Sequence, residues 1–127
     1  MDERKVLING LEVNYKVIGQ GRPLLILHGW GSNSDKWQKV AELLIRKNFE
    51  VIIPDLPGFG KSQEPGEPWD LNDYMEWLSE LCSKIPSLKA GFYLLGHSFG
   101  GAIAVKFSIK YPQGIKKLFL FAAAAIR

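Results

Sequence analysis

The 127-residue chain has little of several features that mark specialised classes of protein. It contains one cysteine, Cys82, so no internal disulfide can form, and its place among apolar residues of an expected helix favours a small core residue over a nucleophile. The first ten residues, MDERKVLING, hold no apolar leader segment. The longest apolar run, 118–126, is shorter than the roughly 20 residues that cross a bilayer. We therefore expect a cytoplasmic protein without a membrane partner.

The chain also has little excess of one sign of charge over the other. Sixteen Lys and Arg residues against 13 Asp and Glu give a net charge of +3, and no basic block is interleaved with aromatic residues, so we expect no nucleic-acid partner. The sequence holds no cluster with metal-ligand spacing and no cofactor motif, so we expect neither a metal nor a cofactor. A hydrophobic content of 46% with 23% charged residues is typical of one soluble globular domain.

Apolar patterning predicts strands and helices in alternation. An Asn-Gly pair at 9–10 joins two short segments as a β-hairpin. Continuous apolar runs predict buried strands, and helical spacing predicts amphipathic helices. The expected strands are 6–8, 11–17, 23–27, 49–54, 92–95 and 117–125, and the expected helices are 37–45, 71–85 with Asp70 as cap, and 99–111. This order predicts an α/β fold: a mostly parallel sheet with an N-terminal β-hairpin and helices on both faces, in a single domain over 1–127.

Three of the expected parallel strands end in glycine-rich sequences. These are HGWGS at 28–32, DLPGFGKS at 55–62 and GHSFG at 96–100. Ligands of open α/β sheets bind at the carboxyl ends of the strands, so we expect the three segments to meet at one edge.

The third segment has the pattern G-x-S-x-G of a nucleophile elbow, between an apolar strand and an apolar helix. Ser98 would sit in a strained turn that presents its hydroxyl, and Gly96 and Gly100 would allow strand and helix to approach closely. The N–H of Phe99, at the start of the helix, would face a developing oxyanion. The alternative is a glycine-rich turn without chemistry.

The other two segments each have two interpretations. HGWGS can aim a backbone N–H, that of Trp30, at the same oxyanion, or it can be a tight turn in which Ser32 or Ser34 caps the next helix. GFGKS ends like a phosphate-binding loop, but that motif needs glycine at position 55, where the chain has Asp55, and a helix that the segment QEPGEP at 63–68 cannot form.

Taken together, these motifs resemble the N-terminal half of the α/β-hydrolase superfamily. The resemblance implies Ser98 as nucleophile, the N–H groups of Trp30 and Phe99 as oxyanion hole, no cofactor, and a small ester-like substrate cleaved through an acyl-serine. Ester, thioester and related acyl hydrolysis fit a serine. Branches that carry Asp at this position, the dehalogenases and epoxide hydrolases, are disfavoured.

The family places its acid and histidine after the serine, yet residues 99–127 contain no Asp, Glu or His. His97 would point to the opposite face from Ser98. A relay of Asp55, His28 and Ser98 makes His28, at the oxyanion-loop turn, a weak candidate base. We expect a domain truncated after the strand that follows the elbow helix, catalytically incomplete alone. The alternatives are an interaction module, or half of a split hydrolase that a partner completes across the exposed edge strand 117–125.

Overall fold

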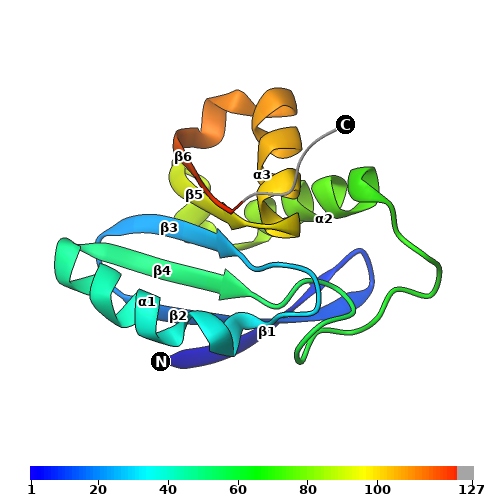
Figure 1. Cartoon of the computed structure of the whole chain (residues 1–127), viewed down its shortest axis with the longest axis horizontal. Coiled ribbons are helices and arrows are strands. Elements are labelled where there is room, and N and C mark those ends of the chain that lie inside the picture. The colour runs from blue at the N-terminus through cyan, green and yellow to red at the C-terminus, as the bar shows by residue number, and fades with distance from the viewer. Residues whose placement is uncertain (123–127) are drawn as a thin grey trace.

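A computed structural model describes residues 1–122 and gives an alternating order of strands and helices (Figure 1). The elements match the predicted order throughout. The strands are β1 (Asp2–Ile8), β2 (Leu11–Gly19), β3 (Arg22–Leu27), β4 (Phe49–Pro54), β5 (Phe92–His97) and β6 (Ile115–Phe121), and the helices are α1 (Gln38–Leu44), α2 (Leu71–Lys84) and α3 (Phe99–Lys110).

All six strands form one sheet, in the order β1-β2-β4-β3-β5-β6. β3 pairs in parallel with β4 and β5, and β5 pairs in parallel with β6, whereas β2 runs antiparallel to both β1 and β4. The hairpin turn has positive φ at Asn9 (50°) and Gly10 (80°), as a two-residue hairpin requires. The predicted α/β fold, mostly parallel with an N-terminal hairpin, is confirmed.

Helices cover the sheet from both sides, which explains the continuous apolar runs of its central strands (Figure 1). Leu24 and Ile26 of β3 point to one face, where they share a core with Ala41 of α1. The alternate residues, Leu25 and Leu27, point to the other face and share a larger core with residues of α2 and α3. The carboxyl ends of β3, β4 and β5 are therefore held in place by apolar cores on both faces of the sheet.

Several boundaries differ from the prediction. β1 begins at Asp2 because an exposed edge strand can carry the charged residues of DERK. The helix predicted over 37–45 is divided into a 3₁₀ turn (Ser34–Trp37), α1, and a second 3₁₀ turn (Ile45–Lys47). β6 begins earlier than predicted and ends at Phe121, and positions 123–125 of the predicted strand lie outside the described residues.

Asp70 is the predicted cap of α2. Its carboxylate accepts a hydrogen bond from the Asp73 amide at 2.9 Å, and the Asp73 carboxylate accepts one from the Asp70 amide at the same distance. This reciprocal capping ends the long segment between β4 and α2 at a defined residue. In the part of the chain that the structure describes, no helix has both the length and the apolar character needed to span a membrane.

Candidate active site

Ser98 lies at the sharp junction between β5 and α3, as the elbow pattern predicts. Its backbone has φ 54° and ψ −120°, a conformation that costs a non-glycine residue on the order of 1–3 kcal/mol. A Cβ added to Gly96 would lie 2.6 Å from the carbonyl oxygen of Gly100, and one added to Gly100 would overlap the carbonyl oxygen of Leu27. Both glycines are therefore required by the close approach of strand and helix.

The elbow also meets the loop that follows β3. A Cβ on Gly29 would lie 3.1 Å from the Cβ of Ser98, and the rings of Trp30 and Phe99 are in edge contact with centroids 5.1 Å apart. The first hydrogen bonds of α3 run from the amides of Gly101 and Ala102 to the carbonyl of Ser98, so the Phe99 amide precedes the intrahelical ladder. The structure thus brings Trp30, Ser98 and Phe99 together.

His28 is held in a way that contradicts its interpretation as a base. It is fully buried, its Nε2 accepts a hydrogen bond from the Leu56 amide at 2.9 Å, and its Nδ1 lies 2.7 Å from the Gly29 carbonyl. Because Leu56 N–H donates to Nε2, the proton belongs on Nδ1, which donates to Gly29. Burial lowers the pKa of His28 and favours this neutral form. Neither ring nitrogen is left for Ser98, so His28 fastens the loop instead.

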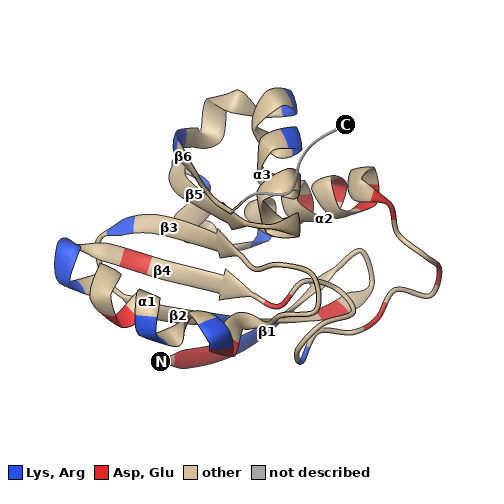
Figure 2. Cartoon of the chain, in the orientation of Figure 1, with Lys and Arg blue, Asp and Glu red and all other residues tan. Residues whose placement is uncertain are grey.

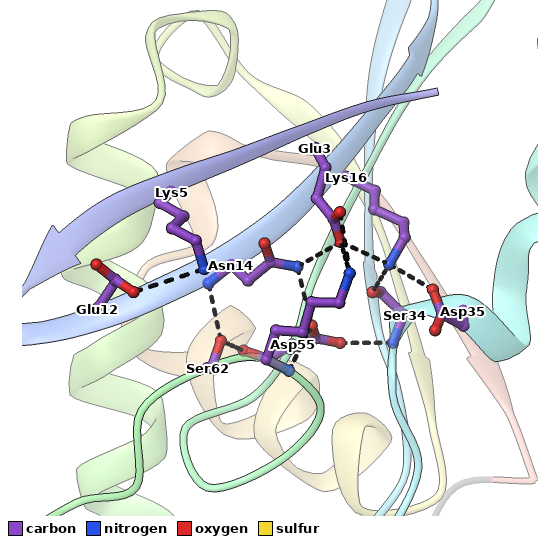
Figure 3. Close-up of polar contacts among 10 residues, drawn as sticks. Glu3, Lys5, Glu12, Asn14, Lys16, Ser34, Asp35, Asp55 and Ser62 are labelled. Carbon is purple, nitrogen blue, oxygen red and sulfur yellow. Dashed lines mark hydrogen bonds and ion pairs between the residues drawn. The ribbon is translucent and has the colours of Figure 1, made fainter.

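Asp55 likewise has a structural environment rather than a place in a relay (Figure 3). Its carboxylate, 1% exposed, accepts hydrogen bonds from the Ser34 amide (2.7 Å), the Asn14 side chain (3.1 Å) and the Lys61 amide (3.1 Å). Buried carboxylates need such donors to offset their desolvation. Asp55 therefore joins β2, the loop after β3 and the loop after β4.

Lys16, buried on β2, completes this network from the other side of Ser34 (Figure 3). Its ammonium lies 2.6 Å from the Asp35 carboxylate, 2.7 Å from Ser34 Oγ and 3.4 Å from Glu3. Burial by itself lowers the pKa of Lys16, but the hydrogen bond and charge of Asp35 outweigh it and raise the pKa overall. Lys16 is therefore a cation that fixes the start of the 3₁₀ turn.

Residues 28–34 are consequently attached at both ends to the segment after β4. His28 binds the Leu56 amide at one end, and the Ser34 amide binds Asp55 at the other. Ser34 does not cap the following helix, as one interpretation of the sequence had it, because its hydroxyl accepts from Lys16. Sequence reasoning missed this network, although two polar residues at buried positions of β2, Asn14 and Lys16, were a signal for it.

His97 packs toward the face of the sheet covered by α1, as the alternation of side chains along a strand predicts, although its Nδ1 would lie 3.2 Å from a Cβ on Gly29 and so is near Ser98. Its ring contacts Trp37, at 5.5 Å between centroids, and stacks on Phe121 at 5.4 Å. These contacts place it on the face of the sheet covered by α1. His97 therefore packs beside the elbow, and within residues 1–122 no hydrogen bond joins its ring to Ser98.

A cleft of about 510 Å³ lies between Trp30 and the segment that connects β4 to α2. Aromatic side chains and prolines dominate its wall, and Tyr74 and Trp30 connect it to the elbow through edge contacts with the Phe99 ring. Among residues 1–122, no group of three or more His, Cys, Asp or Glu side chains is arranged to hold a metal ion. The lining of the cleft consists of Trp30, Pro57, Gly58, Phe59, Glu64, Pro65, Gly66, Glu67, Pro68, Trp69 and Tyr74.

Comparison with known proteins gives a consistent picture. The family model for the alpha/beta hydrolase fold matches residues 22–126. The chain is 34% identical to a soluble epoxide hydrolase of Corynebacterium sp. over 116 residues, which cover 91% of this chain and 40% of that protein. It is 34% identical to a pimeloyl-[acyl-carrier protein] methyl ester esterase of Pseudoalteromonas atlantica over 110 residues, 86% of this chain and 40% of the esterase.

Solved structures agree with this. A bacterial membrane phospholipase A superposes with a TM-score of 0.89 at 28% identity, over 99% of this chain and 41% of that one. The thioesterase domain from the curacin biosynthetic pathway has the same fold, with a TM-score of 0.89 at 24% identity, over 97% of this chain and 46% of that one. The chain spans between 31% and 45% of the length of the curated relatives it matches.

Proposed function

Because this chain belongs to the α/β-hydrolase family, we propose that it supplies the nucleophile and the oxyanion hole of a serine-dependent acyl hydrolase. The observation that carries the proposal is the backbone conformation of Ser98 between a buried strand and a helix. Its φ is 54°, a value that glycine adopts readily but that is unfavourable for serine. Strain of this kind persists where the surrounding structure imposes it, and it is typical of sites that present a reactive side chain.

The residues around Ser98 support acyl transfer. Ser98 Oγ would attack the carbonyl carbon of an ester or thioester, and the amides of Trp30 and Phe99 would donate hydrogen bonds to the oxygen of the tetrahedral intermediate. Expulsion of the alcohol or thiol would leave an acyl-serine, which water would cleave to the acid and free Ser98. Relatives named epoxide hydrolase share the fold, but a serine at position 98 favours the ester and thioester branches over those with an aspartate nucleophile.

The proton of Ser98 needs an acceptor, and neither histidine forms a hydrogen bond with its hydroxyl within residues 1–122. His28 is bound at both ring nitrogens, His97 packs against Trp37 and Phe121, and residues 99–127 contain no His, Asp or Glu. We therefore propose that the acid and the histidine come from polypeptide outside 1–127, and that this chain alone is catalytically incomplete.

The outer edge of β6 is the place where a segment that supplies the acid and the histidine could pair with this chain. Among residues 1–122, β6 pairs only with β5, and its last three residues, Phe119 to Phe121, are exposed. An apolar edge strand is a template for another strand. A segment that adds to this edge would lie next to the end of β6, where the Phe121 carbonyl accepts a hydrogen bond from the Ser98 amide at 3.3 Å. The missing histidine would then enter beside the elbow.

Covalent labelling by a fluorophosphonate probe tests the proposal. Without a base, the oxyanion hole and binding alone retain about 10³ to 10⁴-fold acceleration over water. We expect slow labelling at Ser98, identified by peptide mass spectrometry, and a rate that rises with added imidazole as a substitute base. Ser98→Ala should abolish it.

The matched control is Ser108→Ala, which removes a serine within α3 without touching the elbow. It should label like the unaltered chain. A labelling rate for the unaltered chain no greater than that of Ser98→Ala, with and without imidazole, would contradict the proposal.

A further inference from the structure

The cleft beside the elbow is built from aromatic rings that contact one another. Trp30 meets Phe59 with centroids 4.8 Å apart and Tyr74 at 6.5 Å, and Trp69 meets Tyr74 at 5.1 Å, all in edge-to-face geometry. Tyr74 is fixed from behind, because its hydroxyl donates to the Pro57 carbonyl at 3.0 Å. By contrast, the Trp30 side chain is largely exposed at the mouth, so a ligand can reach it.

The charge of this cleft is opposite to that of the chain. The net charge is +3, yet the charged residues of the lining are Glu64 and Glu67, with no Lys or Arg among them. Figure 2 shows acidic positions along the loop between β4 and α2 that frames the cleft. The nearest basic residue on that loop, Lys61, is engaged elsewhere, because its ammonium lies 3.0 Å from the Glu3 carboxylate.

From this combination we infer that the cleft binds an organic cation, an alkylated ammonium group attached to an apolar body. Aromatic faces attract such cations through their quadrupoles, and alkyl groups on nitrogen lower the cost of leaving water. The carboxylates of Glu64 and Glu67 add attraction of the same sign. A volume of about 510 Å³ lies within the usual range of small-molecule sites, so the body of the ligand fits with its charged group.

The position of the cleft connects this ligand to the proposed chemistry. Trp30 contributes its side chain to the cleft wall and, in the proposed function, its amide to the oxyanion hole. A cation bound here would then be part of the substrate, carried by the acyl group or the leaving group of the ester. That connection rests on the proposed function, whereas binding of the cation does not.

Isothermal titration calorimetry with three matched probes tests the inference. The first is a phenylalkyl trimethylammonium ion, the second is its neutral isostere with a tert-butyl group in place of trimethylammonium, and the third is the corresponding carboxylate. We expect the cation to bind about tenfold more tightly than the neutral isostere, and the carboxylate to bind more weakly than both.

Two variants assign this preference to the cleft. The double variant Glu64→Gln/Glu67→Gln should reduce the preference for the cation at least about threefold, whereas the distant pair Glu42→Gln/Glu80→Gln, which changes the net charge equally, should leave it unaltered. Trp69→Leu should weaken binding of the cation and the neutral probe alike.

Equal affinity for the cation and the neutral isostere, absence of binding by both, or an unchanged preference in Glu64→Gln/Glu67→Gln would each overturn the inference. The same titrations in Ser98→Ala separate it from the proposed function. Binding of the cation should persist there whether or not Ser98 reacts with the fluorophosphonate.

Discussion

Replacement of Ser98 by glycine should stabilise the chain, whereas replacement by alanine should not. The two variants lose the same hydroxyl, which makes no capping hydrogen bond in α3. They differ in the backbone, because glycine adopts φ 54° and ψ −120° without strain and alanine does not. Relief of about 1–3 kcal/mol of strain, less about 0.4–1 kcal/mol for the greater freedom of an unfolded glycine, leaves a gain of about 1.3 kcal/mol at the midpoint of both ranges.

Urea denaturation followed by tryptophan fluorescence measures this difference. We expect Ser98→Gly to exceed both Ser98→Ala and the unaltered chain by about 1 kcal/mol in the free energy of unfolding, and Ser98→Ala to stay within about 0.5 kcal/mol of the unaltered chain. In thermal unfolding the gain corresponds to a rise of about 3–6 °C in Tm. If Ser98→Gly were no more stable than Ser98→Ala, the argument that the fold holds the elbow under strain would be refuted.

Two further predictions concern the buried network and the cysteine. Asp55→Asn should lower the free energy of unfolding by about 2–4 kcal/mol, because one amide oxygen cannot satisfy the three donors that Asp55 now binds, whereas Asp35→Asn, whose carboxylate is 66% exposed, should cost less than about 1 kcal/mol. Similar losses in the two variants would contradict this account. Burial raises the pKa of the Cys82 thiol from 9.0 to about 12. Iodoacetamide should therefore alkylate Cys82 at pH 8 at least about a hundredfold more slowly than free cysteine. Since the folded state holds the proton more tightly than the unfolded state, the contribution of Cys82 to stability should be present below pH 9 and decline as pH rises toward 12. Alkylation at the rate of free cysteine would show that the thiol is not shielded.

The fold could be predicted from the sequence because its central strands are apolar on both faces. β3, β4 and β5 read as continuous apolar runs, and glycine-rich segments follow each of them. The Asn-Gly turn and the Asp70 cap depend on local chemistry, so they too could be found from a few residues. Residue patterns alone do not give the position of β3 between β4 and β5, because strand pairing is set by the packing of the whole sheet, but the family resemblance implies it and the structure agrees.

The residues of the candidate site could be predicted from the sequence, but their hydrogen-bond partners could not. G-x-S-x-G identified Ser98 and its strained turn because glycine spacing reports the close approach of strand and helix. The roles of His28 and Asp55 were a different matter. Sequence position places both residues at the same sheet edge as Ser98, and only the three-dimensional partners show that they bind the Leu56, Gly29 and Ser34 backbone.

The polar network also divides the molecule into parts that respond to different conditions. Apolar cores hold the central strands to the helices, whereas Glu3, Asn14, Lys16 and Asp55 connect the hairpin to the loops beside Ser98 through hydrogen bonds and ion pairs. Salt screens exposed ion pairs such as Lys61–Glu3 far more than buried contacts such as those of Lys16 and Asp55, and it does not weaken the apolar cores in this way. Concentrated salt should therefore loosen the outer end of the network, at Glu3, while the buried contacts of residues 28–34 and the sheet remain in place.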